Sequence, residues 1–240
     1  NISYAIKSNS NISVSLNDDS LAELDKNIIT GKEVGESSLV LQLEGKKQLV
    51  NLNVHNKDDK GGIDSMKKTI NLWQWLGFII TGILGVLLHF LYDWLGQSPL
   101  IALISGVNES TWEHMKLLFF PMFFFALLQA HFWKERPQNF WCIKLYGILI
   151  GLALIPIIFY TFNGVFGKSP DWYNITIFFQ ASAAAYLAET ALFKNDASTC
   201  CASKLALTAL IGIAALFAVF TFFPPKIPLF QDPITLQYGI

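Results

Sequence analysis

The sequence predicts an all-α integral membrane domain with five transmembrane helices, preceded by a small β-rich N-terminal segment. Hydrophobic residues make up 52% of the 240 residues. Charged residues make up 15%, well below the globular norm of about 25%. Beyond residue 72 the charges fall mainly between long apolar runs, which is typical of membrane helices. The net charge of -1 gives no support to nucleic-acid binding, so we expect no nucleic-acid partner.

The N-terminal residues 1–56 carry short stretches in which polar and apolar residues alternate. Residues 12–16 place apolar side chains on one face at period two, and residues 39–43 do the same before a turn at Gly45. The alternation continues at Leu49 beyond that turn. We therefore expect a β-rich polar segment over residues 1–56.

A polar linker is expected over residues 57–70, followed by the membrane domain over residues 71–240. The linker carries Gly61 and Gly62 between charged residues. Met66 with the two lysines after it is typical of the start of a membrane protein. Residues 1–65 are therefore expected to be an added or truncated module.

Five apolar runs predict the transmembrane helices. Each is close to the ~20 residues that a helix needs to cross a hydrocarbon core about 30 Å thick. Helices are expected because lipid offers the backbone no hydrogen-bond partner. The five runs are residues 72–94, 117–133, 140–162, 175–193 and 205–223. The run 99–107 is too short to span and predicts an interfacial segment between the first two helices. Glu189, inside the fourth run, is expected to reach the interface or pair with Lys194.

The placement of Lys and Arg predicts the orientation in the membrane. Nine of these residues flank one side of the predicted bundle and three flank the other. Positive residues favour the cytoplasmic side, so we expect a multi-pass protein of the cell membrane with its N-terminus in the cytoplasm and its C-terminus outside. The cysteines Cys142, Cys200 and Cys201 would then face the cytoplasm, and we expect reduced thiols.

The polar stretch 107–116 is the strongest candidate for a functional site. It holds two carboxylates, a histidine and a lysine directly before an apolar run. Ionisable groups at the mouth of a membrane span are costly unless they are paired or hydrated. The candidates for catalysis are Glu109, Glu113 and His114, and the polar cluster also includes Asn108, Ser110, Lys116, Tyr92 and Asp232.

A purely structural interpretation of the same stretch is also open. Ser110 and Glu113 have the spacing of a capping box, in which Ser110 caps the helix and Glu113 reaches back to the Ser110 backbone N–H. If the helix starts near Asn108, then Glu109, Glu113 and Lys116 share one face. Capping leaves Glu109 and the histidine that follows Glu113 unexplained.

A divalent metal such as Zn²⁺ is a further hypothesis. His89 and Asp93 lie one helical turn apart near the outer end of the first run. With Glu113 and His114 they could supply imidazole and carboxylate ligands. The alternative is a buried histidine that hydrogen-bonds to a neighbouring helix, and the HExxH spacing of a zinc hydrolase is missing from the sequence.

Several segments of the chain match a known pattern. They are His89-Phe90-Leu91-Tyr92-Asp93, the stretch 107–116, Asn139-Phe140-Trp141 with Lys144, Ile155-Pro156 with Phe159-Tyr160-Thr161, and the tail Leu229-Phe230-Gln231-Asp232-Pro233 ending in Tyr238-Gly239-Ile240. Through them residues 66–240 resemble an uncharacterised family of small bacterial multi-span proteins, classed as a domain of unknown function. The resemblance implies a five-helix membrane domain and no particular activity.

Three classes of function remain open. The first is an accessory protein whose polar cluster holds helices together or docks a protein partner or a second copy. The second is a metal-assisted intramembrane hydrolase of a lipid-like substrate, with a carboxylate as general base and His89 and His114 as ligands. The third is a small cation transporter or channel, with Glu109 and Glu113 binding the cation. The sequence shows no nucleophile motif and no internal repeat, so the accessory function ranks first.

Overall fold

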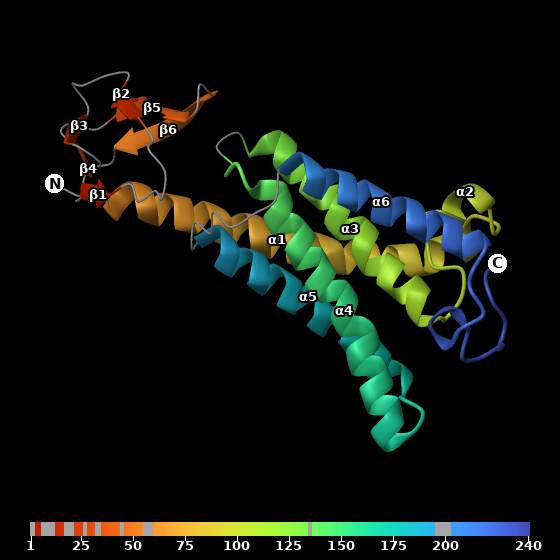
Figure 1. The fold of residues 1–240 in the computed structure, drawn as a ribbon. Coiled ribbons are helices and arrows are strands. Elements are labelled where there is room, and N and C mark those ends of the chain that lie inside the picture. The colour runs from red at the N-terminus through yellow and green to blue at the C-terminus, as the bar shows by residue number, and fades with distance from the viewer. Residues whose placement is uncertain are drawn as a thin grey trace. The chain divides into compact units, whose positions relative to one another are not determined.

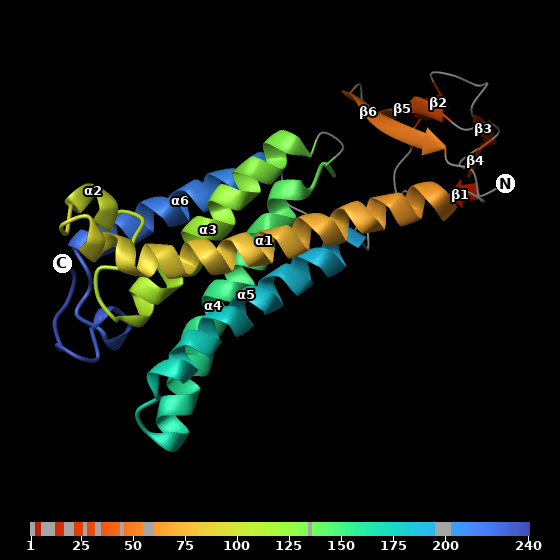
Figure 2. The same cartoon turned by 180° about the vertical axis from the view of Figure 1, so that it is seen from behind.

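The computed structural model describes the chain in two compact units, Asn1–Met66 and Lys67–Ile240. The described residues are 3–5, 13–16, 22–25, 28–31, 35–43, 46–54, 60–133, 136–194 and 203–240. Figures 1 and 2 show the elements from opposite sides.

The first unit contains six short strands in two antiparallel three-stranded sheets, with the orders β1-β4-β3 and β2-β5-β6. The strands are β1 (Ser3–Ala5), β2 (Ser13–Leu16), β3 (Ala22–Asp25), β4 (Ile28–Gly31), β5 (Gly35–Leu43) and β6 (Lys46–Val54). The residues between these strands lie outside the description. Because of these gaps, the expectation that residues 1–56 form a β-rich segment stays a prediction.

The second unit is a helical bundle. Its elements are α1 (Lys60–Trp94, which begins before the unit boundary), α2 (Pro99–Ala102), α3 (Thr111–Phe132), α4 (Phe140–Phe166), α5 (Asp171–Lys194), α6 (Ser203–Phe222) and the 3₁₀ turn η1 (Pro228–Phe230). Five of these helices, α1, α3, α4, α5 and α6, are long and apolar enough to cross a membrane. The prediction of a multi-span membrane domain with five apolar helices is thereby confirmed.

Helix α1 begins earlier than the sequence suggests. It starts at Lys60, inside the stretch 57–70 that is expected as a linker. Neither Gly61 nor Gly62 ends it, because a glycine costs a helix only about 1 kcal/mol relative to alanine. Helix α2 falls within the predicted short segment 99–107, and its placement at the membrane interface stays a prediction.

Helix α3 begins at Thr111 because Ser110 caps it. The Ser110 side chain accepts a hydrogen bond from the Glu113 backbone N–H at 3.3 Å. The reciprocal bond of a capping box is not made, since the Ser110 N–H donates to Asn108 Oδ1 at 2.9 Å. Glu109 therefore precedes the helix, and it does not share one helical face with Glu113.

The core of the second unit lies around α3, which is the most buried of the five helices. Aromatic rings of α3 pack on α6 and on the C-terminal tail. The Trp112 ring centroid lies 4.5 Å from that of Phe217 and 4.8 Å from that of Phe230, and Phe119 also packs on Phe217 at 5.2 Å. Figures 1 and 2 show α4 and α5 side by side, joined by a short turn.

Helices α1 and α5 meet along a seam of glycines and rings, which we call the α1–α5 seam. Gly77 of α1 faces the Tyr186 ring, and a Cβ atom added at Gly77 would lie 2.5 Å from it. Gly85 faces the Phe178 ring in the same way. Rings of α5 therefore occupy the space that side chains of α1 would need.

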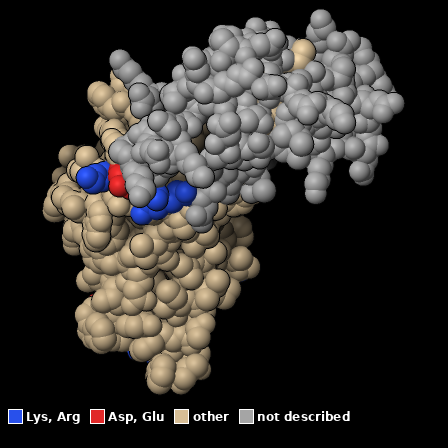
Figure 3. Space-filling model, turned by 90° about the vertical axis from the view of Figure 1, so that its left-hand side faces the viewer, with Lys and Arg blue, Asp and Glu red and all other residues tan. Residues whose placement is uncertain are grey.

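Exposed basic residues gather at one end of the bundle, which we call the basic end. They are Lys67, Lys68, Arg136, Lys194 and Lys204. On the face shown in Figure 3, Lys and Arg lie close together near one end and the surface beyond them carries little charge. The opposite end, with residues 95–110, 167–170 and 223–240, is called the tail end. An uncharged band beside a basic end is typical of a membrane-spanning surface.

Candidate functional site

Three predicted residues lie together at the tail end, and we call them the His–Glu–His cluster. His89 comes from α1, His114 from α3 and Glu109 from the loop between them. Glu109 Oε1 is 3.5 Å from His89 Nε2, and Glu109 Oε2 is 3.5 Å from His114 Nε2. The two imidazole centroids are 5.7 Å apart. The carboxylate thus lies between two imidazoles, and its side chain remains 41% exposed.

The hydrogen bond of His114 to the backbone determines which of its ring nitrogens carries a hydrogen. His114 Nδ1 lies 3.0 Å from the Ser110 carbonyl oxygen. A carbonyl only accepts, so Nδ1 carries a hydrogen. A neutral His114 then turns the lone pair of Nε2 toward the Glu109 carboxylate, which is also an acceptor. The contact becomes favourable when a proton, a cation or a hydrogen-bond donor lies between the two groups.

Two adjoining cavities of about 440 and 390 Å³ reach this cluster. Both volumes fall in the range of about 300–1,000 Å³ that ligand pockets occupy. The residues that line both are Glu109, His114, Asp171, Asn174, Phe178 and Ile234. The larger cavity continues along α4 to Tyr160 and Asn163, and the smaller one runs along the α1–α5 seam to His89. Most of the remaining lining is apolar.

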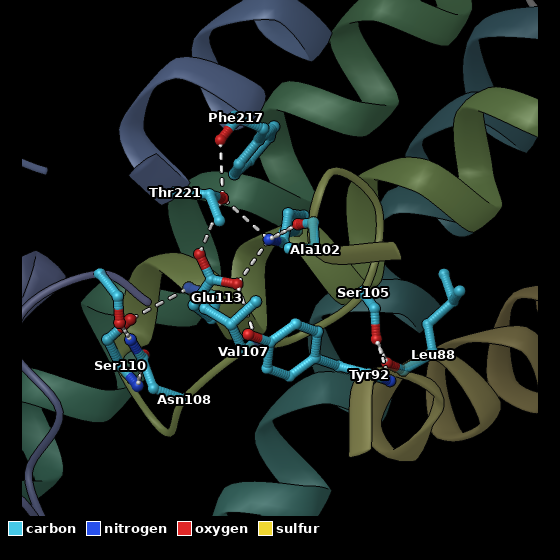
Figure 4. A network of polar contacts seen from close by, with 12 residues as sticks. Leu88, Tyr92, Ala102, Ser105, Val107, Asn108, Ser110, Glu113, Phe217 and Thr221 are labelled. Atoms are coloured by element: carbon cyan, nitrogen blue, oxygen red, sulfur yellow. Dashed lines mark hydrogen bonds and ion pairs between the residues drawn. The ribbon is translucent and has the colours of Figure 1, made fainter. Parts of the chain in front are cut away.

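Glu113 belongs to a different, fully buried network (Figure 4). Its Oε2 lies 2.5 Å from Lys116 Nζ, and these side chains are 3% and 0% exposed. Lys116 Nζ donates to the Ala102 carbonyl at 2.8 Å and to the Thr221 hydroxyl at 2.9 Å. The Val107 N–H donates to Glu113 at 3.1 Å, and the Thr221 hydroxyl lies 3.2 Å from its other oxygen. The network ties α3 to α6 and to the loop after α2, which is a structural role.

Asn108 and Asp232 hold the C-terminal tail in place. The Asn108 side chain donates to the Gly239 carbonyl at 2.9 Å. Asp232 Oδ1 accepts from the Ile234 N–H at 2.7 Å and so closes a tight turn. Gly239 has a φ of 74°, a conformation that favours glycine. Neither Asn108 nor Asp232 lines the two cavities.

Tyr92 and Asp93 also lie away from the cluster. The Tyr92 backbone N–H donates to Ser105 Oγ at 3.0 Å, and the Ser105 hydroxyl donates to the Leu88 carbonyl. These bonds fasten the loop after α2 to the end of α1. Asp93 is exposed and accepts a hydrogen bond from the Gln97 side chain at 3.3 Å.

The geometry gives limited support to a metal. Within the described part of the chain, no three of His, Cys, Asp and Glu are grouped so that they could hold a metal ion. Of the four candidates, His89 and His114 lie together, whereas Glu113 is held by Lys116 and Asp93 by Gln97. A divalent metal therefore stays a prediction.

The structure contains a second buried ion pair, which the sequence did not predict. Lys144 Nζ of α4 lies 2.5 Å from Glu189 Oε2 of α5, and Gln74 Oε1 of α1 lies 3.5 Å from the same nitrogen. The expected pairing of Glu189 with Lys194 is therefore wrong. Gly147 provides the space, since a Cβ atom there would lie 2.6 Å from Glu189 Oε1. The rings of Phe125, Phe140, Tyr186 and Phe193 surround the ammonium at 5.6–5.9 Å.

A signal for this pair exists in the sequence. Lys144 and Glu189 each stand inside an apolar run, close to the basic end, on helices that are consecutive in the chain. Opposite charges at similar depth on neighbouring membrane helices favour a pair.

Cys142 corrects a further expectation. It is fully buried and disulfide-bonded, whereas the sequence predicts a reduced thiol. The other two cysteines, Cys200 and Cys201, lie outside the described residues.

Residues 64–240 match DUF6512, a family of unknown function. No curated protein and no solved structure matches the chain.

Proposed function

We propose that this chain, which belongs to the family of unknown function DUF6512, binds an amphiphilic molecule. The molecule has an amine-like head group and binds at the tail end of the bundle. The supporting observation is that two adjoining cavities share the Glu109 carboxylate and the His114 imidazole. A concave, mostly apolar site with a few convergent polar groups is the usual form of a small-molecule site.

The charges of the shared lining favour a cationic head. Glu109 and Asp171 line both cavities, and no Lys or Arg does so among the described residues. Lys168 lines only the larger cavity. An ammonium group between Glu109 and His114 would donate to the carboxylate and to the Nε2 lone pair, which relieves the contact between two acceptors.

The apolar lining favours a hydrocarbon tail. Phe178 and Ile234 line both cavities, Ile155 and Phe159 continue the larger one, and Phe179 continues the smaller one. The amphiphile would place its head at the His–Glu–His cluster and its chain among these side chains.

The three functions expected from the sequence receive unequal support. An accessory role fits the Glu113–Lys116 network, which holds helices together. The metal-assisted hydrolase receives little support, because no three His, Cys, Asp or Glu residues of the described part are grouped to hold a metal ion. The cation transporter or channel loses one of its two carboxylates, because Glu113 is neutralised by Lys116. Amphiphile binding uses the groups that remain available.

The proposed orientation places the tail end, and with it the site, outside the cytoplasm. The basic end carries most of the exposed Lys and Arg, which favours the cytoplasmic side. The disulfide-bonded Cys142 lies near that same end and argues for the opposite orientation, since disulfides persist in oxidising compartments. We retain the orientation given by the basic residues because they determine insertion directly.

The test compares a long-chain primary amine with the alcohol of the same chain, both added to the full-length protein in uncharged nanodiscs. We expect the amine to bind about tenfold more tightly, the usual scale of one charge-assisted hydrogen bond. Glu109→Gln should remove that preference, because the amide cannot supply the negative charge. Binding is measured by the shift of the unfolding temperature over a concentration series.

Asp93→Asn is the matched control, since Asp93 is a carboxylate at the same end that lines neither cavity. It should leave the preference for the amine unchanged. Equal affinity of the wild type for amine and alcohol would contradict the proposal. An equal loss of the preference for the amine in Glu109→Gln and Asp93→Asn would contradict it too.

A further inference from the structure

A third cavity lies at the basic end, between α1 and α5, and is separate from the His–Glu–His cluster. Its volume is about 370 Å³. Its lining residues lie between Asn71 and Phe78 of α1 and between Ala183 and Lys194 of α5. Trp75 is 66% exposed and Leu187 is 69% exposed. The cavity therefore opens to the side of the bundle, on a surface that faces lipid in a membrane.

The polarity of the cavity changes along the helices. At 1.5 Å per residue, the α1 side from 71 to 78 covers about 10 Å. Asn71 and Lys194 stand at the basic end, whereas Phe78 and Ala183 lie toward the middle of the bundle. A groove that is polar at the membrane surface and apolar deeper down has the same profile as a membrane lipid.

The polar part of this groove offers donors. Lys194 supplies an ammonium, and Asn71 supplies a side-chain amide. The Thr190 hydroxyl already donates to the Tyr186 carbonyl at 2.7 Å. No Asp or Glu lines the groove in the described part of the chain. Donors without a neighbouring carboxylate favour a ligand with acceptor oxygens.

We propose that an anionic phospholipid binds in this groove. Its phosphate lies at Lys194 and Asn71, and one acyl chain runs past Trp75 toward Phe78. The exposed Lys67 and Lys68, about one turn before Asn71, add positive charge beside the head group. Basic pockets between membrane helices bind acidic lipid head groups in this way.

Two lipids with identical acyl chains test the proposal, dioleoyl phosphatidylglycerol and dioleoyl phosphatidylcholine. Each is titrated onto the purified full chain in a neutral detergent, and bound lipid is counted by native mass spectrometry. We expect phosphatidylglycerol to bind about fivefold more tightly, as one Lys near a membrane surface contributes on the order of 1 kcal/mol. Lys194→Gln should abolish that preference.

Lys204→Gln is the matched control, because Lys204 is an exposed lysine of the basic end that does not line the groove. It should keep the preference for phosphatidylglycerol. Ala183→Leu, which fills the apolar part of the groove, should weaken the binding of both lipids equally. Equal binding of the two lipids to the wild type overturns the proposal, and so does an equal loss of preference in Lys194→Gln and Lys204→Gln.

Discussion

Glu113 and Lys116 of α3 are opposite charges buried one turn apart, and each depends on the other. Removing one partner of a buried pair leaves an uncompensated charge, so Glu113→Gln should lower the free energy of unfolding by about 3 kcal/mol. The double variant Glu113→Gln with Lys116→Met should recover much of that loss. Unfolding in a denaturing detergent, followed by circular dichroism, measures both.

Glu109→Gln is the comparison for this prediction. Glu109 lies only four residues away but is 41% exposed, so its contacts with His89 and His114 are screened by solvent. We expect a change within about 1 kcal/mol, as for surface ion pairs. A cost at Glu113 as small as that at Glu109 would show that the buried pair contributes little to the stability of the bundle.

The sequence predicts which residues form this site, but it predicts few of the contacts that these residues make. His89, Glu109 and His114 stand out because ionisable side chains are rare beside apolar runs. Glu113 and Lys116 are expected on one helical face, but the groups that complete their network could not be predicted, because they depend on how residues 99–107 fold. Only that loop brings the Val107 N–H and the Ala102 carbonyl to the pair.

At the scale of elements, the Lys144–Glu189 pair joins α4 to α5 inside the apolar region. Lys144→Met should lower the free energy of unfolding by about 3 kcal/mol, because Glu189 keeps a buried charge without a counter-ion. Adding Glu189→Gln to Lys144→Met should restore most of the stability. The measurement is again unfolding of the purified protein.

Lys194→Met separates the two possible partners of Glu189. Lys194 is exposed at the end of α5, so its loss should change the stability by no more than about 0.5 kcal/mol. A larger effect of Lys194→Met than of Lys144→Met would favour the pairing that the sequence suggests.

The five helices could be predicted because the length of an apolar run is a local property of the chain. Their starts were less predictable. Helix α3 begins six residues before the apolar run at 117, because the cap at Ser110 sets its start. The pairing of α4 with α5 through Lys144 depends on Gly147, whose role becomes visible only when the two helices are packed.

At the scale of the whole molecule, the boundary between the two units predicts an independent membrane domain. A chain that starts at Met66 should insert and unfold at the same temperature as the full chain, since the core of the second unit lies within residues 67–240. Thermal unfolding of both in the same detergent tests this. A lower unfolding temperature of the shorter chain would show that residues 1–65 stabilise the bundle.

The orientation is the second prediction at this scale. A reporter fused after Ile240 should be active only outside the cytoplasm, and one fused after Lys194 only inside, because basic residues gather beside Lys194. The reverse pattern would agree with the disulfide at Cys142 and would place the His–Glu–His cluster on the cytoplasmic face.

The α1–α5 seam has a consequence for the order in which the bundle assembles. Helix α1 meets its neighbours through rings seated on glycines, and its backbone stays further from them than α4 does from α5. It leaves the ribosome before the other four spanning helices, yet the α5 rings that it fits against are synthesised only after α3 and α4. We therefore expect α1 to stay in the bilayer as a separate helix and to dock only when α5 has inserted. Proteolysis or cross-linking of nascent chains of increasing length tests this order. Contacts of α1 with α5 should form only in chains long enough for α5 to have inserted.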